Sequence, residues 1–342
     1  MSDSFFDDAA SEDTASPKAS RKGGRKALIV LLGLLLVLGL GTLGVAGWYL
    51  QSLNDGLSSI KRAPGLLPDN APPANSSEGA GEDGSPAPLN FLIIGSDSRG
   101  SDRGRSDTLM LMHIPSNRNS VNLISIPRDS WVPIEGHGVS KINAAYSWGG
   151  APLAVTTVQN LLGIRINHVV ITDFEGFNNT IDVWGGVDVY NARESSAHGY
   201  EWPAGHITLS TGEEAQRYVR QRHGLPNGDF DRSERQRSVA TGIIKKLTSA
   251  GVITNPGKFR NALTTLGPNF TVDEGLTNEV IMETGKEVGL KGADNIRSLL
   301  LPTDGFGRSE GGASYVKLDD AGVQKLSTAL QQDEFDNYWK QR

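Results

Sequence analysis

The sequence contains no cysteine. This absence excludes disulfide bonds, thiolate nucleophiles and cysteine-ligated metal centres. Histidine is scarce as well, and the six histidines form neither an HExxH motif nor a close pair, which argues against a histidine-ligated metal. An excess of positive charge is also missing, because the formal net charge is -6, whereas nucleic-acid-binding proteins present basic surfaces. We therefore expect no nucleic-acid partner, and any anionic ligand must be bound by local clusters of arginine.

Charged residues are absent from residues 27–50, ALIVLLGLLLVLGLGTLGVAGWYL. As a helix this segment would be about 36 Å long, which is enough to cross a bilayer core of about 30 Å. Arg21, Lys22, Arg25 and Lys26 precede it, and basic flanks stay in the cytoplasm. A cleaved signal peptide normally has a shorter apolar run of about 7–15 residues. We therefore predict a single-pass anchor in the cell membrane, with a cytoplasmic N-terminus and an extracytoplasmic remainder.

The rest of the chain divides by composition. Residues 1–26 are polar and low in complexity, which predicts a disordered cytoplasmic tail. Residues 51–88 are rich in proline, glycine and serine, which predicts a linker without a core. Residues 89–342 predict one α/β domain, with a central mixed β-sheet covered by helices on both faces. Strands are expected at 89–97, 108–114, 121–127, 168–174, 296–302 and 314–318, and helices at 152–163, 212–220, 232–251, 257–266, 276–288 and 319–332.

A glycine-rich loop between the first two predicted strands carries aspartates and arginines. Asp97 ends the first strand and Asp107 starts the second, whereas Asp102 lies in the middle of the loop. Two carboxylates from one loop can hold Mg²⁺ or Mn²⁺ and leave coordination positions open for phosphate and water. The loop lacks the GK[ST] sequence of a P-loop. The alternative interpretation is a solvated surface loop without a ligand.

Arginine clusters are the second feature that carries chemistry. Arg128 follows a predicted strand directly, although a plain ion pair with Asp129 would also explain it. A larger cluster lies within residues 218–237, and it consists of Arg220, Arg222, Arg232, Arg235 and Arg237. Arginine suits phosphate because its planar guanidinium offers paired N–H donors and keeps its charge. A basic helix face alone is often only solvated, but beside a carboxylate loop these arginines predict a metal-assisted phosphoryl-transfer site.

The geometry of the larger cluster depends on where the helices end. If residues 230–240 are helical, Arg232, Arg235 and Gln236 share one face of that helix. Arg220 and Arg222 share a side only where the chain is extended, so we expect the preceding helix to end at Arg220.

These motifs, in this order and spacing, resemble those of the LytR-CpsA-Psr family of cell-wall enzymes. The matching segments lie within residues 89–250 and read NFLIIGSDSR, RSDTLMLMHI, LISIPRDSWVPI, KINAAYSWGG, ITDFEGF, GGVDV, YVRQR and DFDRSERQ. The resemblance implies a phosphotransferase that moves an anionic glycopolymer from an undecaprenyl-pyrophosphate carrier onto peptidoglycan. A muramic acid hydroxyl would attack the sugar-linked phosphorus, forming a phosphodiester and releasing prenyl phosphate. The resemblance does not distinguish teichoic acid from capsule or arabinogalactan as the polymer.

The resemblance also implies residue roles by motif. Asp97 and Asp107 would bind Mg²⁺, or Mn²⁺ in its place, at the pyrophosphate. The phosphate oxygens would be contacted by Arg105, Arg128, Arg220, Arg222 and Arg232, with Arg235 and Gln236 beside them. Lys141 and Asp173 fall in matching motifs and are further candidates for substrate binding. One departure is Arg237, because the family often has glutamine there.

A prenyl carrier would also require an apolar groove near the membrane. Leu161, Leu162, Val170 and Phe174 are the candidates for its lining, and the alternative is that they belong to the ordinary core. Two other functions stay open. A pyrophosphatase that releases the carrier head group to water would use the same metal and arginines, whereas a non-catalytic surface lipid-binding anchor would need no metal.

Overall fold

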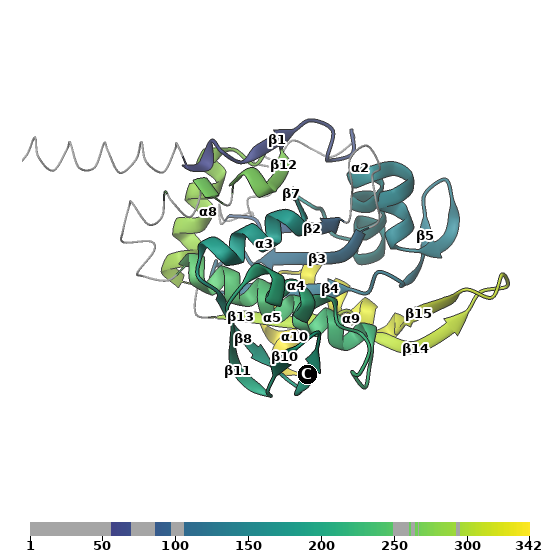
Figure 1. Cartoon of the computed structure of the whole chain (residues 1–342). Helices are drawn as coiled ribbons and strands as arrows, with labels where there is room; N and C mark the ends of the chain where they lie inside the picture. The colour runs from purple at the N-terminus through teal and green to yellow at the C-terminus, as the bar shows by residue number, and fades with distance from the viewer. Residues whose placement is uncertain are drawn as a thin grey trace, which may run out of the picture. The chain divides into compact units, whose positions relative to one another are not determined.

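The computed structural model describes residues 56–69, 86–96, 106–248, 260, 264–265, 267–291 and 295–342. A seven-stranded sheet lies at the centre of these residues, in the order β1-β12-β7-β2-β3-β4-β13 (Figure 1). Its strands are β1 (Lys61–Ala63), β2 (Leu89–Ser96), β3 (Ser106–Ile114), β4 (Val121–Ile126), β7 (His168–Asp173), β12 (Phe270–Asp273) and β13 (Ile296–Leu300). Strands β2, β3 and β4 are antiparallel neighbours, while β7 runs parallel to β2 and β13 runs parallel to β4. The predicted mixed sheet is therefore confirmed.

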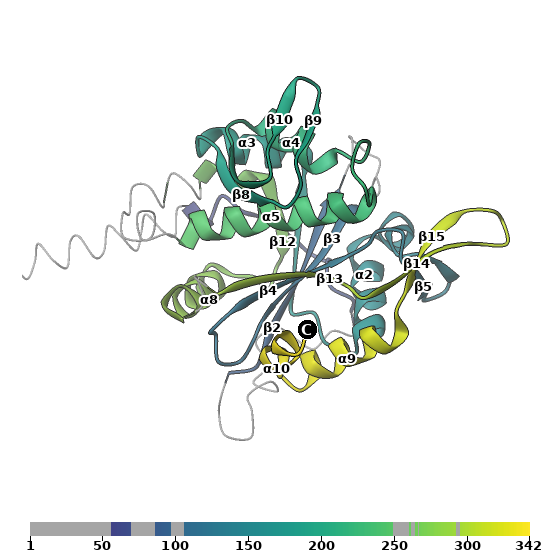
Figure 2. The ribbon, with the colours of Figure 1, turned by 90° about the horizontal axis from the view of Figure 1, so that it is seen from below.

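Helices cover both faces of this sheet, as predicted. On one face lie α2 (Asn143–Leu162), α9 (Asp320–Gln331) and α10 (Phe335–Lys340), and on the other lie α5 (Asp229–Thr248) and α8 (Asn278–Lys291). Figure 2 shows α5 on one side of β4 and β13, with α9 and α10 on the other. The central strands are consequently apolar on both faces, because neither face meets water.

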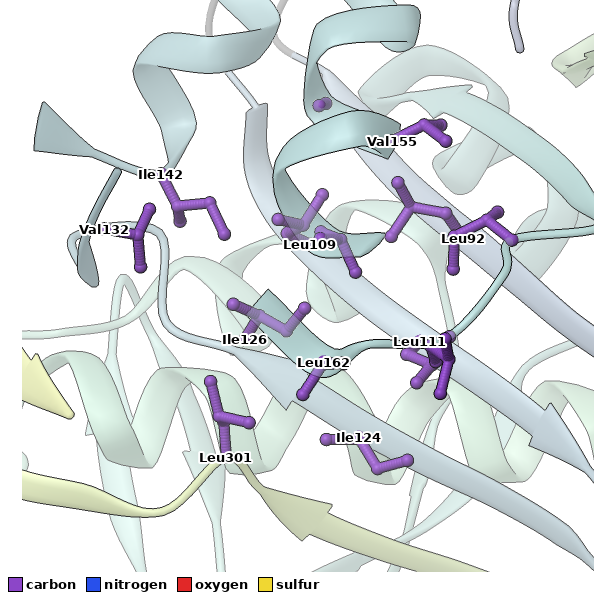
Figure 3. Packing of buried hydrophobic residues seen from close by; sticks show 14 of the residues in the cluster. Leu92, Leu109, Leu111, Ile124, Ile126, Val132, Ile142, Val155, Leu162 and Leu301 are labelled. Atoms are coloured by element: carbon purple, nitrogen blue, oxygen red, sulfur yellow. The ribbon is translucent and has the colours of Figure 1, made fainter. Parts of the chain in front are cut away.

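The larger core lies between the sheet and the α2 face. Leu92, Leu111 and Ile124 are fully buried there against Val155 and Leu162 of α2 (Figure 3). Alternate residues of the same strands point to the other face, because successive side chains of a strand point to opposite sides. The second core therefore lies between the sheet and helices α5 and α8, and it contains Phe91, Met110 and Leu123. Its other buried members are Ile114, Val121, Val272, Leu276 and Val288.

A third layer packs on the outer side of α5. It contains α3 (Phe174–Val183), α4 (Gly212–Arg220), the hairpin of β8 (Val187–Asn191) with β11 (Gly205–Leu209), and the hairpin of β9 (Ser195–Ala197) with β10 (Tyr200–Trp202). This layer has its own core, with Trp202 and Tyr218 at its centre, and Val239 of α5 packs in the same core. Helix α5 thus lies between this layer and the sheet, and it contributes apolar side chains to both.

Two further hairpins and a 3₁₀ turn complete the described elements. The first hairpin is β5 (Trp131–Ile134) with β6 (Gly138–Lys141), and the second is β14 (Thr303–Arg308) with β15 (Ser314–Leu318). The short 3₁₀ turn η2 spans Gly267–Asn269. The sequence prediction contained β15 but none of the other strands in these hairpins. Strands β5 and β6 have only four residues each, and β14 contains two glycines and a single large apolar residue, Phe306, so none of the three shows a clear apolar pattern.

The predicted helix boundaries are confirmed where capping residues set them. Helix α4 matches its predicted range, and the hydroxyl of Thr211 accepts a hydrogen bond from the backbone N–H of Glu214 at its start. Helix α2 ends before Gly163, whose left-handed backbone (φ 62°) suits glycine. Helix α2 begins earlier than predicted, with a break at Gly150. The predicted helix at 319–332 is confirmed as α9, but it is not the last helix, because α10 follows it.

The predicted linker needs correction as well. Within residues 51–88, β1 adds a strand to the edge of the sheet by pairing in parallel with β12. Leu57 is only 1 % exposed, and a Cβ at Gly267 would collide with Ser59, so this segment packs tightly against η2. Its short strand was hidden by the surrounding prolines and glycines. Residues 56–69 therefore belong to the folded unit.

Several predictions fall on residues outside the described ranges. These include the tail at 1–26, the anchor at 27–50 and most of the helix at 257–266. Among the described residues, no helix is both long enough and apolar enough to span a bilayer.

The packing of the β1 segment can be tested with Leu57→Ala. Removing a fully buried leucine side chain should lower the free energy of unfolding by about 2–4 kcal/mol, because both transfer energy and a cavity are involved. Lys61→Ala, at an exposed position of β1, should change it by less than about 0.5 kcal/mol. Urea unfolding followed by circular dichroism measures both. Equal midpoints for the two variants would show that the segment is a linker after all.

Candidate functional site

The candidate site is assembled at one edge of the central sheet. Parallel pairing places Ser96 of β2 opposite Asp173 of β7, and antiparallel pairing places Ser96 opposite Ser106 of β3. Strand β4 ends at the same edge, since Ile126 lies opposite Leu109. The carboxyl ends of β2, β4, β7 and β13 therefore gather where β3 begins. Ligand sites of α/β sheets form beyond such strand ends.

The carboxylate candidates come from this edge. Asp97 directly follows Ser96, and the backbone of Asp107 lies at the start of β3, one residue after Ser106. The two strands approach closely here, because a Cβ at Gly95 would stand 2.9 Å from the Cβ of Thr108, and the register shifts at the next pair. The register thus brings the end of β2, which Asp97 follows in the sequence, next to the backbone of Asp107. Arg105, Asp97 and the side chains of Asp107 and Asp173 lie outside the described part of the structure.

A cation site at this position is compatible with the described residues around it. The hydroxyl oxygen of Ser106 is buried and has no hydrogen-bond partner among the described residues. A buried hydroxyl without a partner is unfavourable, so a ligand or water is expected beside it. Within the described residues, no group of three or more histidine, aspartate or glutamate side chains could hold a metal by itself.

The first arginine unit lies where β4 ends. Asp129 is held between two cations, with its carboxylate 3.2 Å from Nζ of Lys141 and 4.0 Å from Nε of Arg128. Lys141 is thus the nearer partner of Asp129. The Arg128–Asp129 ion pair, which was the alternative interpretation of the sequence, is present but is the longer of the two contacts. The backbone fixes the turn, because Asn143 donates to the carbonyl of Arg128.

The second arginine unit lies between α4 and α5. Gln221 is extended (φ −60°, ψ 131°), so α4 ends at Arg220 as predicted. Arg232 donates to the carboxylate of Asp229 at 2.9 Å, and Nε of Arg222 lies 3.7 Å from the same carboxylate. Asp229 therefore draws the two arginines together from different segments. The side chain of Arg232 is nearly buried and that of Arg222 is about half exposed.

Arg235 is buried and contacts residues of the third layer and of the end of α4. It is 4 % exposed, it donates to Gln221 at 2.6 Å and to Ser195, and its guanidinium lies 4.3 Å from the ring centre of Tyr218. Burial lowers the pKa of Arg235, and burial also raises the pKa of Tyr218 to about 12. These contacts direct Arg235 toward the third layer, where it holds the end of α4, and its predicted role in substrate binding stays a prediction. Gln236, its neighbour on α5, is partly exposed.

The apolar groove candidates do not come together. Leu162 is fully buried and Leu161 partly buried in the core on the α2 face, whereas Val170 packs in the core on the opposite face. Alternation along β7 explains this, because Val169 is the residue that points toward α2. Leu162 and Val170 are therefore core residues of two different faces. The side chain of Phe174 lies outside the described part of the structure.

Comparison with known proteins identifies the family. The LytR_cpsA_psr family model matches residues 71–332. The polyisoprenyl-teichoic acid–peptidoglycan teichoic acid transferase TagU of Bacillus anthracis is 37% identical over 246 residues, covering 71% of this chain and 78% of the relative. The chain belongs to the LytR-CpsA-Psr family. The resemblance seen in its motifs is thereby confirmed.

Solved structures of LytR-CpsA-Psr proteins share the fold. The crystal structure of TagU from B. subtilis has a TM-score of 0.56 and 31% identity, covering 72% of this chain and 96% of the other. A structure of TagT bound to LI-WTA has a TM-score of 0.60 and 26% identity, covering 81% and 99%. The described sheet and its helices are thus the family fold.

Arg237 is a charged residue that is buried in the folded protein. Arg237 is 8 % exposed, and neither its Nε nor its Nη1 has a hydrogen-bond partner within the described residues. Burial lowers the pKa of its guanidinium to about 10, which Glu234 opposes and Arg342 reinforces. The guanidinium therefore keeps its charge at neutral pH, and burying this charge destabilises the folded protein. This destabilisation is relieved as the pH rises through about 10.

Sequence reasoning missed the carboxylates that organise the arginines. Asp129 had been considered only as a partner of Arg128, and Asp229 had no role at all, although it lies three residues before Arg232. The spacing of Asp229 and Arg232 within one helical turn was the available signal. The contact of Asp229 with Arg222 could not be found in this way, because it joins two segments separated by a loop.

Arg237→Met should stabilise the protein. Replacing a buried charge that has no hydrogen-bond partner at Nε and Nη1 among the described residues with an apolar side chain of similar length removes its desolvation penalty, for an expected gain of roughly 1–3 kcal/mol at neutral pH. The melting temperature should rise by about 2–4 °C per kcal/mol for a domain of this size, and the gain should shrink above pH 10.

Arg118→Met is the matched control. Arg118 is equally buried but donates to Glu287, Ala87 and Pro115, so its loss should lower the melting temperature. A drop for Arg237→Met as large as that for Arg118→Met would reveal a partner for Arg237.

Proposed function

We propose that this chain is a metal-dependent phosphotransferase that moves an anionic glycopolymer from an undecaprenyl-pyrophosphate carrier onto peptidoglycan. The observation that carries the proposal is that two carboxylates, Asp129 and Asp229, each hold basic side chains, and that Asp129 follows β4 at the edge where β2 ends and β3 begins. Several fixed positive charges beside a pair of carboxylates suit a pyrophosphate, whose transfer depends on positioning and charge stabilisation. The transferase names of the curated relatives support the reaction class.

The reaction forms one bond and breaks one. A hydroxyl oxygen of the acceptor sugar attacks the phosphorus that bears the glycopolymer, and the bond from this phosphorus to the bridging oxygen breaks. The products are a phosphodiester and prenyl phosphate, and the hydroxyl proton passes to solvent or to a base. The divalent cation, Mg²⁺ or Mn²⁺, would be held by Asp97 and Asp107 and would neutralise charge on the pyrophosphate.

The arginines have defined tasks in this proposal. Arg128, directly after β4, and Arg220 and Arg222, at and just beyond the end of α4, would contact the phosphate oxygens. Asp129 and Asp229 hold the arginines in place before substrate arrives, which lowers the conformational entropy lost on binding. Arg232 is fixed on Asp229 and acts with Arg222 as one charged unit.

The location of the reaction follows from the carrier. A prenyl pyrophosphate resides in the membrane, so we propose that residues 27–50 anchor the chain and that the folded unit lies on the extracytoplasmic side. The uncharged segment and its preceding basic residues support this orientation.

The proposed metal dependence can be tested by substituting the aspartates of the loop. Asp97→Ala and Asp107→Ala should each reduce release of prenyl phosphate on the order of 100-fold or more, as the loss of a group that stabilises developing charge does. Asp102→Ala, in the same loop, should retain activity. Chromatography of the lipid products with Mg²⁺ or excess chelator measures this. Full activity in chelator would refute the metal site, and lipid release without transfer to peptidoglycan would identify a pyrophosphatase instead.

The arginine geometry can be tested by substitutions that conserve charge. Arg128→Lys, Arg220→Lys and Arg222→Lys should each lower kcat/KM by roughly 10–100-fold, because lysine offers a point charge instead of paired donors. Arg217→Lys is the control, since Arg217 on α4 pairs with Glu213 at the surface. Steady-state kinetics compares the four variants. Wild-type values for all of them would show that charge alone suffices.

A further inference from the structure

An aromatic surface that the reaction does not use lies on the β14–β15 hairpin. Phe306 is 62 % exposed, although its ring stacks on Phe230 with centres 5.1 Å apart and planes 24° apart. On the opposite face of the hairpin, Tyr315 stacks on Trp131 at 4.6 Å. Figures 1 and 2 show this hairpin extending away from the central sheet. Its exposed ring is therefore supported from behind but open in front.

The hairpin is connected to both arginine units. The backbone N–H of Val316 donates to the carbonyl of Asp129 at 2.8 Å, and Ser130 pairs with Val316 in a β-bridge. On the other side, Phe230 directly follows Asp229 at the start of α5. The Phe230–Phe306 pair thus adjoins the segment that holds Arg222 and Arg232. A ligand on this pair would reach the phosphate-binding arginines without crossing the rest of the domain.

The chemistry of the hairpin favours a sugar ring as the occupant. An exposed phenyl ring presents a flat face that is electronegative, and a pyranose offers a flat face of C–H groups with hydroxyls around its rim. The residues beside Phe306 are small or polar, because Gly305 and Asp304 are exposed on the same strand. A prenyl tail would require an enclosing apolar groove, which these neighbours do not provide. One-sided stacking is sufficient for a sugar.

Charge distinguishes the two glycans of the proposed reaction. Within residues 303–318, the acidic Asp304 and Glu310 balance the basic Arg308 and Lys317. Lys317 is moreover paired with Asp304. A hairpin without net charge gives no preference for the anionic donor polymer. It suits the glycan strand of the acceptor, whose ring must be presented to the phosphorus.

We propose that Phe306, supported by Phe230, is a stacking platform for a sugar ring of the acceptor glycan strand. The identity of the glycan rests on the proposed function, whereas the platform itself rests on the exposed and supported ring. Tyr315 is a positioning residue, because its ring lies over Gly307, where a Cβ would collide with it, and so links the hairpin to Trp131.

The test is direct binding without turnover. Isothermal titration of the full chain with soluble, uncharged N-acetylglucosamine oligomers, a sugar of the acceptor strand, should show at least a five-fold weaker Kd for Phe306→Ala. Phe306→Trp should restore binding, because it retains a flat ring. Val183→Ala, at another exposed apolar position on α3, should bind like the wild type. Melting temperatures should agree for all variants, since these side chains are exposed.

The outcomes separate this proposal from the proposed function. Loss of glycan binding in Phe306→Ala, with KM for the acceptor raised and kcat unchanged, supports both. Glycan binding that depends on Phe306 in a protein without transferase activity supports the platform and refutes the transfer. Unchanged glycan binding in Phe306→Ala overturns the platform. So does a Phe306→Ala variant that instead loses binding to prenyl phosphate vesicles, or that changes from dimer to monomer in sedimentation.

Discussion

The register of β2 against its two neighbours is the constraint on which the rest of the site depends. Ser96 lies opposite both Asp173 and Ser106, so three chain segments meet at one point of the sheet edge. The absence of a side chain at Gly95 allows β2 and β3 to approach there. A shift of one residue in this pairing would turn Leu92 and Ile94 away from the α2 face. The core therefore enforces the geometry of the site.

Carboxylates organise the cations of this site. Asp129 binds Lys141 and approaches Arg128, and Asp229 joins Arg222 to Arg232. Each aspartate contacts residues from different segments, so the arginines are positioned in the absence of ligand. Arg235 contributes indirectly, because it fixes the end of α4 through Gln221. In contrast, Arg237 is buried without a hydrogen-bond partner among the described residues.

The two additional hairpins connect the site to the surface. Hairpin β5–β6 carries Lys141 to Asp129, and hairpin β14–β15 is hydrogen-bonded to the carbonyl of Asp129 and stacked on Phe230. Asp129 thus pairs with Lys141 through its side chain and holds the β14–β15 hairpin through its backbone carbonyl. The consequence is that acceptor recognition at Phe306 and phosphate binding at Arg128 would be mechanically linked through Asp129.

The sequence by itself determined five of the seven sheet strands, the major helices, the family and the residues that carry charge. Continuous apolar runs such as that of β2 identify strands covered on both faces, and caps such as Gly163 and Thr211 fix helix ends locally. Only the tertiary structure decided which residues meet. It assigned Leu162 and Val170 to opposite faces of the sheet, turned Arg235 into the third layer and moved β1 from the predicted linker into the sheet. These outcomes depend on contacts between segments distant in the chain, whose free energies no local pattern encodes.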